Sequence, residues 1–500
     1  MTLGATALIV TLVTIAAFAG LGLLQASRQP TTLEDYMVSR NRIGTGPALA
    51  TIVASAMGAW ILFSPPEVGA TSGITGIVGY CIGQATPAVL LAFMGTRIRF
   101  LMPQGHSLNE YVLHRFGNAM YVLTLGIIVF YMFVYLTAEL TAIAKAVELM
   151  AGVPLWLTAV LVITAVFVYT TAGGLAATIF TDTIQFAVIV PLLLLSFAIA
   201  LVGLGGWDTA VQPVTQTAPE LLTLANGPGI KFGATLVIAV IAAEMFNQAN
   251  WQRIYACKND VVVRRSFLGS FLLIVPLLFI SGLLGILAMH FGFSDDRAFF
   301  SLIQALGLPG WVSIAVLVLV LALVMSSLDT LLNGIASVFT TDLLRLFPSM
   351  PSRGILQASR ILTVAVGIPV VLIAAQGYNV LYLFLLADLV CAGALFPVLF
   401  GLYSRRLTGA IAFWSSLLGI AAGALFFPRP DFSPWNSLPY AGDLLVSFAL
   451  PIVVSFGVSM IWIQIKAQQG QTEAFDFQRL DTEIRAYGET DPLAPAELSQ

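Results

Sequence analysis

The stretch LALVMSSLDTLLNGIASVFTTD, from Leu321 to Asp342, decides how this chain can fold. It is long and apolar enough to cross a bilayer, yet within about two helical turns it carries Ser326, Ser327, Asp329, Thr330 and Asn333. An aspartate at the bilayer centre costs roughly 2.5–3.5 kcal/mol, so these groups must face a partner, a water-filled cavity or an ion. The stretch therefore predicts a membrane protein with a polar interior.

The hydroxyl groups of this stretch are grouped on one side of the predicted helix. Ser326, Ser327 and Thr330 lie near one face, because residues three and four positions apart are neighbours on a helix. Oxygen ligands are those that hard cations prefer, so this face is a plausible wall of a cation site. The structural alternative is that the hydroxyls bond to the preceding turn and that Asp329 lies at a hydrated helix end. The stretch alone leaves both open.

The composition extends this prediction to the whole chain. Of its 500 residues 58% are hydrophobic and only 9% are charged, and the mean hydropathy is +0.94. These are too few charges to solvate a soluble surface of this size. Apolar windows of about 20 residues predict thirteen membrane-spanning helices, near residues 4–25, 47–70, 74–95, 119–150, 154–171, 175–205, 231–253, 266–291, 309–343, 358–376, 379–403, 408–427 and 442–465.

Lysine and arginine residues gather on alternate predicted loops, for example Arg97 with Arg99, Arg253 with Lys258, and Arg405. By the positive-inside rule these loops are cytoplasmic, which places the N-terminus outside and the C-terminus in the cytoplasm. We therefore expect a multi-pass protein of the plasma (inner) membrane. The loop at 97–118 is polar and predicts a short amphipathic helix.

The second predicted span is irregular. It reads ALATIVASAMGAWILFSPPEVG, with Gly58 near its middle, and Pro65 and Pro66 remove two backbone donors further on. One interpretation is a kinked helix whose small residues pack closely against a neighbour. The other is a broken helix whose freed carbonyl groups coordinate an ion, as in secondary transporters.

Carboxylates recur in apolar surroundings, at Glu139, Asp182, Glu244, Asp329 and Asp388. Each one alone has a structural explanation, such as pairing of Glu139 with Lys145, or water near a helix end for Asp182 or Glu244. Exposed to lipid, all five together would cost more than about ten kcal/mol. We therefore expect several of them to line an interior.

Four motifs in order along the chain point to one family: LEDYMVSRNRIG (33–44), AGGLAATIFTDTIQF (172–186), NQANWQRIYACKNDVVVRRSF (247–267) and MSSLDTLLNGIASVFTTDL (325–343). From the first helix to about residue 465 the chain resembles the sodium/solute symporter family, which includes sodium/proline and sodium/sugar symporters. The resemblance implies an all-α polytopic membrane protein with a leucine-transporter-type five-plus-five inverted repeat. The implied parts are an extra N-terminal helix and loop (1–45), a first repeat (46–205), an extracellular loop (206–230), a second repeat (231–403), two extra helices (404–466) and a polar cytoplasmic tail (467–500).

The resemblance also implies a set of ion ligands. The main sodium site would use backbone carbonyls of Ala54, Met57 and Leu323 with the hydroxyls of Ser326 and Ser327. A second cation site, present in only some members, would comprise Asp182, Asp329 and Thr330.

The solute cavity implied by the resemblance would be lined by Trp60, Tyr135, Glu139, Glu244 and Asn247. The chain departs from the proline-transporting members, which have an aromatic residue in place of Met245. Glu139 and Glu244 align with small residues of those members. Two carboxylates here suggest a cationic or amine-bearing solute, or a buried proton site.

The sequence thus predicts sodium-coupled symport of a small polar organic solute, such as an amino acid, a carboxylate, urea or an amine, by alternating access. Proton coupling is the alternative within this fold, and a transporter-like solute sensor is a rival of another class. No nucleophile with a base, metal set or phosphate loop indicates an enzyme. The expected partners are the solute and the lipid bilayer, with no nucleic acid.

Overall fold

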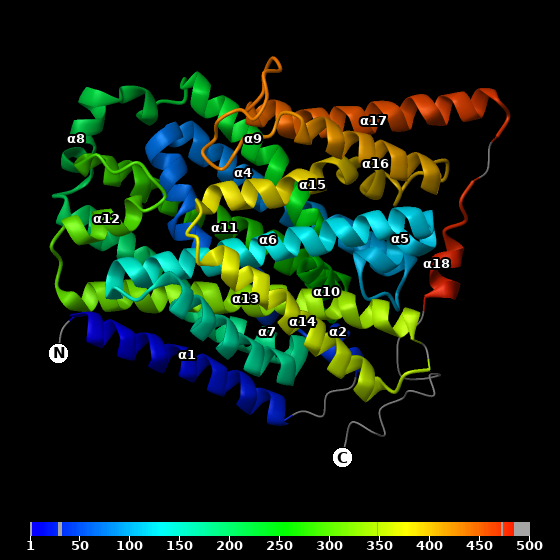
Figure 1. Cartoon of the computed structure of the whole chain (residues 1–500), viewed down its shortest axis with the longest axis horizontal. Helices are drawn as coiled ribbons and strands as arrows, with labels where there is room; N and C mark the ends of the chain where they lie inside the picture. The colour runs from blue at the N-terminus through cyan, green and yellow to red at the C-terminus, as the bar shows by residue number, and fades with distance from the viewer. Residues whose placement is uncertain (1–2, 29–32, 348, 472–473, 485–500) are drawn as a thin grey trace.

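The computed structural model describes residues 3–28, 33–347, 349–471 and 474–484, and the described chain is almost entirely helical (Figure 1). Its longer helices are α1 (Leu3–Arg28), α3 (Thr45–Ala56), α4 (Ser64–Leu101), α6 (Asn118–Ala151), α7 (Leu155–Gly203), α9 (Gly227–Phe246), α11 (Asp260–Ala288), α13 (Gly310–Leu346), α14 (Ser352–Ala374), α15 (Val380–Phe400), α16 (Gly409–Ala424) and α17 (Leu444–Gln468). Ten helices in this part of the chain are long and apolar enough to cross a membrane. The predicted all-α polytopic architecture is confirmed.

A glycine turns the chain inside two long helices, so that α7 supplies two of the thirteen predicted spans and α4 supplies the end of the second span and the whole of the third. Gly73 in α4 has φ 67° and ψ −160°, and Gly174 in α7 has φ 56° and ψ −156°. These values lie in a region that other residues rarely adopt. At Gly174 a β-carbon would also lie 2.8 Å from the backbone oxygen of Tyr36. Both turns fall between windows that the hydropathy separated.

Shorter helices lie between the spans or extend them: α2 (Leu33–Met37), α5 (Leu108–Phe116), α8 (Trp207–Thr217), α10 (Gln248–Ala256), α12 (Ala298–Ala305) and α18 (Gln478–Glu483), with 3₁₀ turns at Ala59–Leu62 (η1), Pro219–Leu222 (η2) and Met289–Phe291 (η3). α5 confirms the amphipathic helix predicted in the polar loop. α1 begins at the same end of the molecule as α8 and α12, whereas α17 runs to the opposite end, which holds α5 and α18 (Figure 1). Of the predicted tail, residues 485–500 lie outside the described residues.

α4 is at the centre of the packing, and its contacts with α11 and α9 are the most extensive in the fold. Small residues allow this close approach. A β-carbon on Gly285 would lie 1.8 Å from the carbonyl oxygen of Pro66, and one on Gly79 would lie 2.2 Å from the α-carbon of Gly233. Glycines at such crossings let helix backbones touch, as is typical of membrane proteins.

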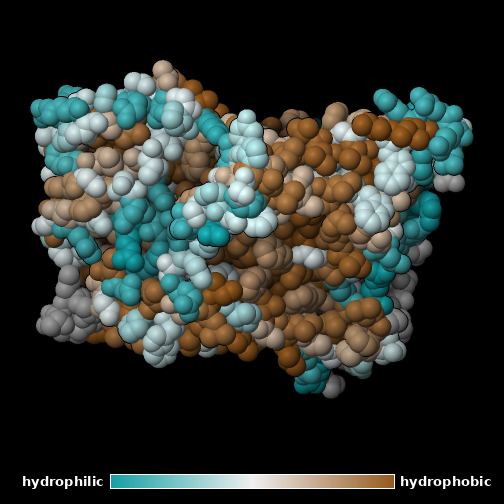
Figure 2. Space-filling model, turned by 45° about the horizontal axis from the view of Figure 1, so that its top comes forward, coloured by the Kyte–Doolittle hydropathy of each residue, from teal (hydrophilic) through white to brown (hydrophobic). Residues whose placement is uncertain are grey.

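The surface is divided as a membrane requires. Figure 2 shows a broad hydrophobic region across the centre of the visible face, with hydrophilic residues gathered toward the two ends. Many large apolar side chains are exposed, including Val202, Leu272 and Ile361. Lipid tails, rather than water, suit such a surface.

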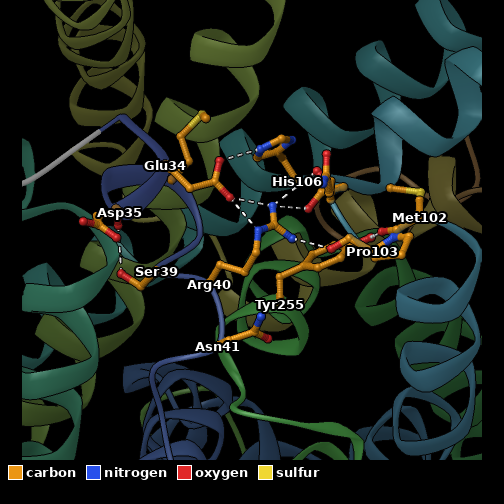
Figure 3. A network of polar contacts seen from close by, with 12 residues as sticks. Glu34, Asp35, Ser39, Arg40, Asn41, Met102, Pro103, His106 and Tyr255 are labelled. Atoms are coloured by element: carbon orange, nitrogen blue, oxygen red, sulfur yellow. Dashed lines mark hydrogen bonds and ion pairs between the residues drawn. The ribbon is translucent and has the colours of Figure 1, made fainter. Parts of the chain in front are cut away.

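A polar network joins residues 34–41, in and after α2, to the loop at 102–106 and to Tyr255 of α10 (Figure 3). The buried His106 ring contacts Glu34 at 2.8 Å and Glu110 at 3.3 Å. Arg40 contacts Glu34 at 2.6 Å and donates to the carbonyl of Pro103 at 2.8 Å. Burial alone would lower the pKa of His106, but the carboxylates of Glu110 and Glu34 outweigh it and raise this pKa to about 9.

The raised pKa of His106 makes stability depend on pH. An unfolded histidine has a pKa of about 6.5, so the folded state gains stability that is complete below about pH 6.5 and is lost as the pH rises through the folded value. We expect His106→Gln to lower the melting temperature near neutral pH, by the equivalent of on the order of 3 kcal/mol, and the deficit to shrink toward about pH 10.

Thermal unfolding of detergent-purified protein across this pH range measures the effect. His114→Gln is the matched control, because His114 pairs with Glu483 near the surface and such pairs contribute less than about 1 kcal/mol. A deficit for His106→Gln that stays constant with pH would contradict the charged imidazole.

Candidate functional site

The second span is a broken helix. α3 ends at Ala56, and Met57 (φ −110°, ψ 83°) and Gly58 (φ −82°, ψ −175°) leave the helical conformation before η1 begins at Ala59. Among the described residues the carbonyl oxygen of Met57 accepts no hydrogen bond from the backbone. The break therefore frees backbone oxygens inside the bundle, which is the arrangement that a cation can use.

Glu139 on α6 holds this break in place. One carboxylate oxygen accepts hydrogen bonds from the backbone N–H of Ala59 at 2.8 Å and from the Ser327 hydroxyl at 2.9 Å. The other oxygen, Oε1, is buried and has no hydrogen-bond partner in the described chain. A β-carbon on Gly58 would lie 2.0 Å from that oxygen, so any larger residue there would displace the Glu139 carboxylate. Glu139 thus joins the broken helix to α13.

A second carboxylate, Asp182 on α7, also joins the second span to α13. It accepts hydrogen bonds from Ser326 on α13 and from Thr51 on α3, both at 2.5 Å. It also pairs with Arg253 of α10 at 2.9 Å, and both charged side chains are fully buried. Arg253 donates further to Thr330 at 2.8 Å.

Arg253 corrects one reading of the sequence. We counted it among the positive residues of a cytoplasmic loop, but the side chain turns inward from α10 and contacts α3, α7 and α13. Charge alone does not reveal this, because a buried partner on a distant helix decides where an arginine at a helix end points. The guanidinium of Arg253 lies between Asp182 and Thr330, two of the three ligands predicted for a second cation.

The third of those ligands, Asp329, has other neighbours. One of its oxygens accepts hydrogen bonds from Tyr169 at 2.9 Å and from Thr181 at 3.2 Å, and the other has no hydrogen-bond partner among the described residues. Asp329 and Asp182 are both fully buried, so the hydrated helix end that the sequence left open for each does not apply. The alternative pairing of Glu139 with Lys145 does not occur either, since Lys145 contacts Asp296 at 2.5 Å.

The residues predicted for the main sodium site lie on α3 with the break that follows it and on α13, and α13 contacts both α3 and η1. The carbonyl of Ala54 accepts the N–H of Met57 at 3.3 Å, and the carbonyl of Leu323 accepts the Ser327 hydroxyl at 3.3 Å. The hydroxyl of Ser326 donates a hydrogen bond to Asp182, and that of Ser327 donates one to Glu139. All five predicted ligand atoms are oxygens, and the unpartnered oxygen of Glu139 is a further one. Such a set of ligands suits a hard monovalent cation.

A narrow cavity lies beside the break. It is lined by the aromatic residues Trp60, Tyr80, Tyr131, Tyr135 and Phe384, the polar residues Gln84, Glu244 and Asp388, and apolar residues of α9 and α15. The cavity volume that a water-sized molecule can reach is only about 20 Å³, which is room for about one water. A solute can enter only after the surrounding helices move apart.

Three of the five predicted solute residues, Trp60, Tyr135 and Glu244, line this cavity. Glu139 is bonded to the broken helix instead, and Asn247 lies at the break between α9 and α10, where its amide donates to Glu244 at 3.3 Å. Sequence reasoning did not place Tyr80, Tyr131, Phe384 and Asp388 at the site. Of these only Asp388 carried a signal, as a carboxylate in an apolar span.

Comparisons with known proteins agree with this geometry. A family model described as the sodium:solute symporter family matches residues 36–419. A spermidine transporter of Candida albicans is 27% identical over 379 residues, covering 74% of this chain and 70% of that protein. A sodium/glucose cotransporter of Vibrio parahaemolyticus is 28% identical over 428 residues, covering 75% and 77%. A sodium/proline symporter of Escherichia coli is 25% identical over 381 residues, covering 71% and 74%.

Solved structures show the same fold at low identity. A Na⁺-coupled sialic acid symporter superposes with a TM-score of 0.74 at 19% identity, over 92% of this chain and 98% of that one. Mhp1, a nucleobase-cation-symport-1 family transporter, superposes with a TM-score of 0.57 at 15% identity, over 85% and 96%. These likenesses confirm the predicted leucine-transporter-type fold. The boundaries drawn for its two repeats stay a prediction.

The buried pair of Asp182 and Arg253 makes a testable contribution to stability. Removing one partner leaves the other charge buried without compensation, which typically costs 3–5 kcal/mol. We therefore expect Arg253→Met and Asp182→Asn each to lower the melting temperature strongly, and the double variant to lose much less than the sum of the two.

A thermal-unfolding double-mutant cycle checks this coupling. The exposed pair Lys231 and Asp443 is the control, for which a coupling below about 1 kcal/mol is expected. Additive losses at Arg253 and Asp182 would show that the two charges do not interact.

Proposed function

The chain belongs to the sodium:solute symporter family, and we propose that it is a sodium-coupled symporter which carries a small polar organic solute across the plasma membrane by alternating access. The observation that carries this proposal is the break at Met57 and Gly58, which Glu139 ties to Ser327 of α13. A cation bound there contacts two helices at once, so its arrival and departure change how they are held together.

Sodium would be held by the carbonyls of Ala54, Met57 and Leu323 and by the hydroxyls of Ser326 and Ser327. Both serines already bond to a carboxylate in this conformation, so sodium binding shifts those hydrogen bonds. The fold of Na⁺-coupled neighbours supports this assignment. The membrane potential adds about 2.3 kcal/mol per charge per 100 mV to the driving force.

A single sodium ion per cycle is the stoichiometry that the geometry favours. The guanidinium of Arg253 contacts Asp182 and Thr330, and so supplies the positive charge that a second cation would bring there. By the lysine and arginine placement, the N-terminus would be outside and the C-terminus cytoplasmic, so the end with α5 and α18 would be the inner face.

The solute would bind in the aromatic cavity beside the break, where Trp60, Tyr135 and Glu244 meet. Relatives named for spermidine, glucose and proline show that one fold serves different solutes. The support for solute binding here is therefore the cavity itself, whose rings and polar groups converge beside the ion ligands.

Sodium should stabilise the purified protein before any solute is known. A ligand of the folded state contributes about 2.7 kcal/mol at a hundredfold excess over its Kd. We expect NaCl to raise the melting temperature above that in choline chloride at equal ionic strength, and Ser326→Ala with Ser327→Ala to abolish the difference.

Ser415→Ala is a matched control, because this buried serine of α16 bonds only to its own helix. Equal melting temperatures in the two salts, with a pH-dependent shift removed by Asp329→Asn, would contradict sodium coupling and support protons as the driving ion.

A further inference from the structure

The cavity beside the break carries an excess of negative charge. Glu244 of α9 and Asp388 of α15 both line it, and their side chains are 6% and 5% exposed. Glu244 accepts hydrogen bonds only from neutral groups, the amides of Asn250 at 2.9 Å and Asn247 at 3.3 Å and, weakly, Tyr131 at 3.5 Å. Asp388 forms no hydrogen bond or ion pair with any other described residue.

No cationic side chain of the described chain balances these two carboxylates. The buried cations have other partners: Lys145 pairs with Asp296, Arg253 pairs with Asp182, and Arg115 donates to the carbonyls of Gly401 and Ser404. Charges buried in a medium of low dielectric are costly unless they are compensated. The positive charge that compensates these carboxylates, whether protons or a cationic solute, must therefore come from outside the chain.

The rings around the carboxylates indicate what kind of cation fits. Trp60 stacks on Tyr80 with 5.5 Å between ring centroids, and Phe384 lies 4.9 Å from Tyr135 and 5.7 Å from Trp60. Aromatic faces attract ammonium groups and pack against alkyl chains, whereas a small inorganic ion prefers oxygen ligands on all sides. Rings combined with carboxylates therefore favour an organic ammonium ion.

We infer that the transported solute is an organic cation, an aliphatic amine whose protonated nitrogens pair with Glu244 and Asp388 while its carbon chain packs against the rings. Two carboxylates on two neighbouring helices accommodate two ammonium groups, so a short diamine is the best match. This inference rests on the proposed function for transport, but binding of the amine can be measured separately from sodium.

An isosteric series tests the inference by binding to the purified full-length chain. The probes are 1,4-diaminobutane, butylamine and 1,4-butanediol, which share a four-carbon chain and differ in the number of ammonium groups. In sodium, melting temperature and calorimetric titration should show binding in the order diamine, monoamine, diol, with no measurable binding of the diol.

Substitutions then locate the ammonium groups. Glu244→Gln and Asp388→Asn, which keep the shape and remove the charge, should each weaken diamine binding by about tenfold or more, since charged hydrogen bonds contribute about 1.5–3 kcal/mol. Glu67→Gln is the control, because Glu67 is a partly buried carboxylate bonded to Asn379 outside the cavity. Variants are compared only where they keep the sodium-induced stabilisation, so loss of folding is not mistaken for loss of binding.

The outcomes separate the two proposals. A melting temperature that sodium raises, with no binding of any amine, overturns the amine inference and leaves sodium symport intact. Diamine binding that both carboxylate variants retain has the same meaning. Diol binding as tight as the diamine's also overturns it. Amine binding without a sodium shift supports the inference and contradicts sodium coupling.

Discussion

The hydrogen bonds of Glu139 to Ala59 and Ser327 are the contact on which the rest of the structure depends. A helix interrupted inside a membrane has backbone groups that lipid cannot satisfy, so another helix must satisfy them. The carboxylate caps the new helical turn at Ala59 and holds α13 against it. Asp182 repeats the arrangement between Thr51 and Ser326. The two carboxylates together place the hydroxyls of α13 beside the carbonyls freed by the break.

Charge pairing explains how the interior tolerates these acids. Asp182 has Arg253 and Asp296 has Lys145, so those pairs are compensated within the chain. Glu139 has hydrogen bonds but no cation, and it lies where sodium is proposed to bind. Glu244 and Asp388 have no cation and face the solute cavity. The uncompensated acids thus coincide with the two places where sodium and the solute are proposed to bind.

Hydropathy predicted the spans well, because each span must cover the same thickness of lipid. The glycines at 73 and 174 lie between neighbouring predicted spans. The break at Met57 to Gly58 matches one of the two interpretations that small residues and prolines inside an apolar run left open. The cavity was predicted only in part. Tyr80 and Phe384 look like ordinary core residues in sequence, and nothing local distinguishes an inward-facing Arg253 from a loop arginine. Those assignments depend on contacts between distant helices.

The central claim is that sodium joins the broken second span to α13. Hydrogen–deuterium exchange of the purified chain, compared in NaCl and in choline chloride, tests it directly on both segments. The account predicts that sodium slows exchange together in residues 53–63 and 321–330, while the amides of α16 exchange equally in both salts. Equal exchange in the two segments, or protection confined to one of them, would contradict it.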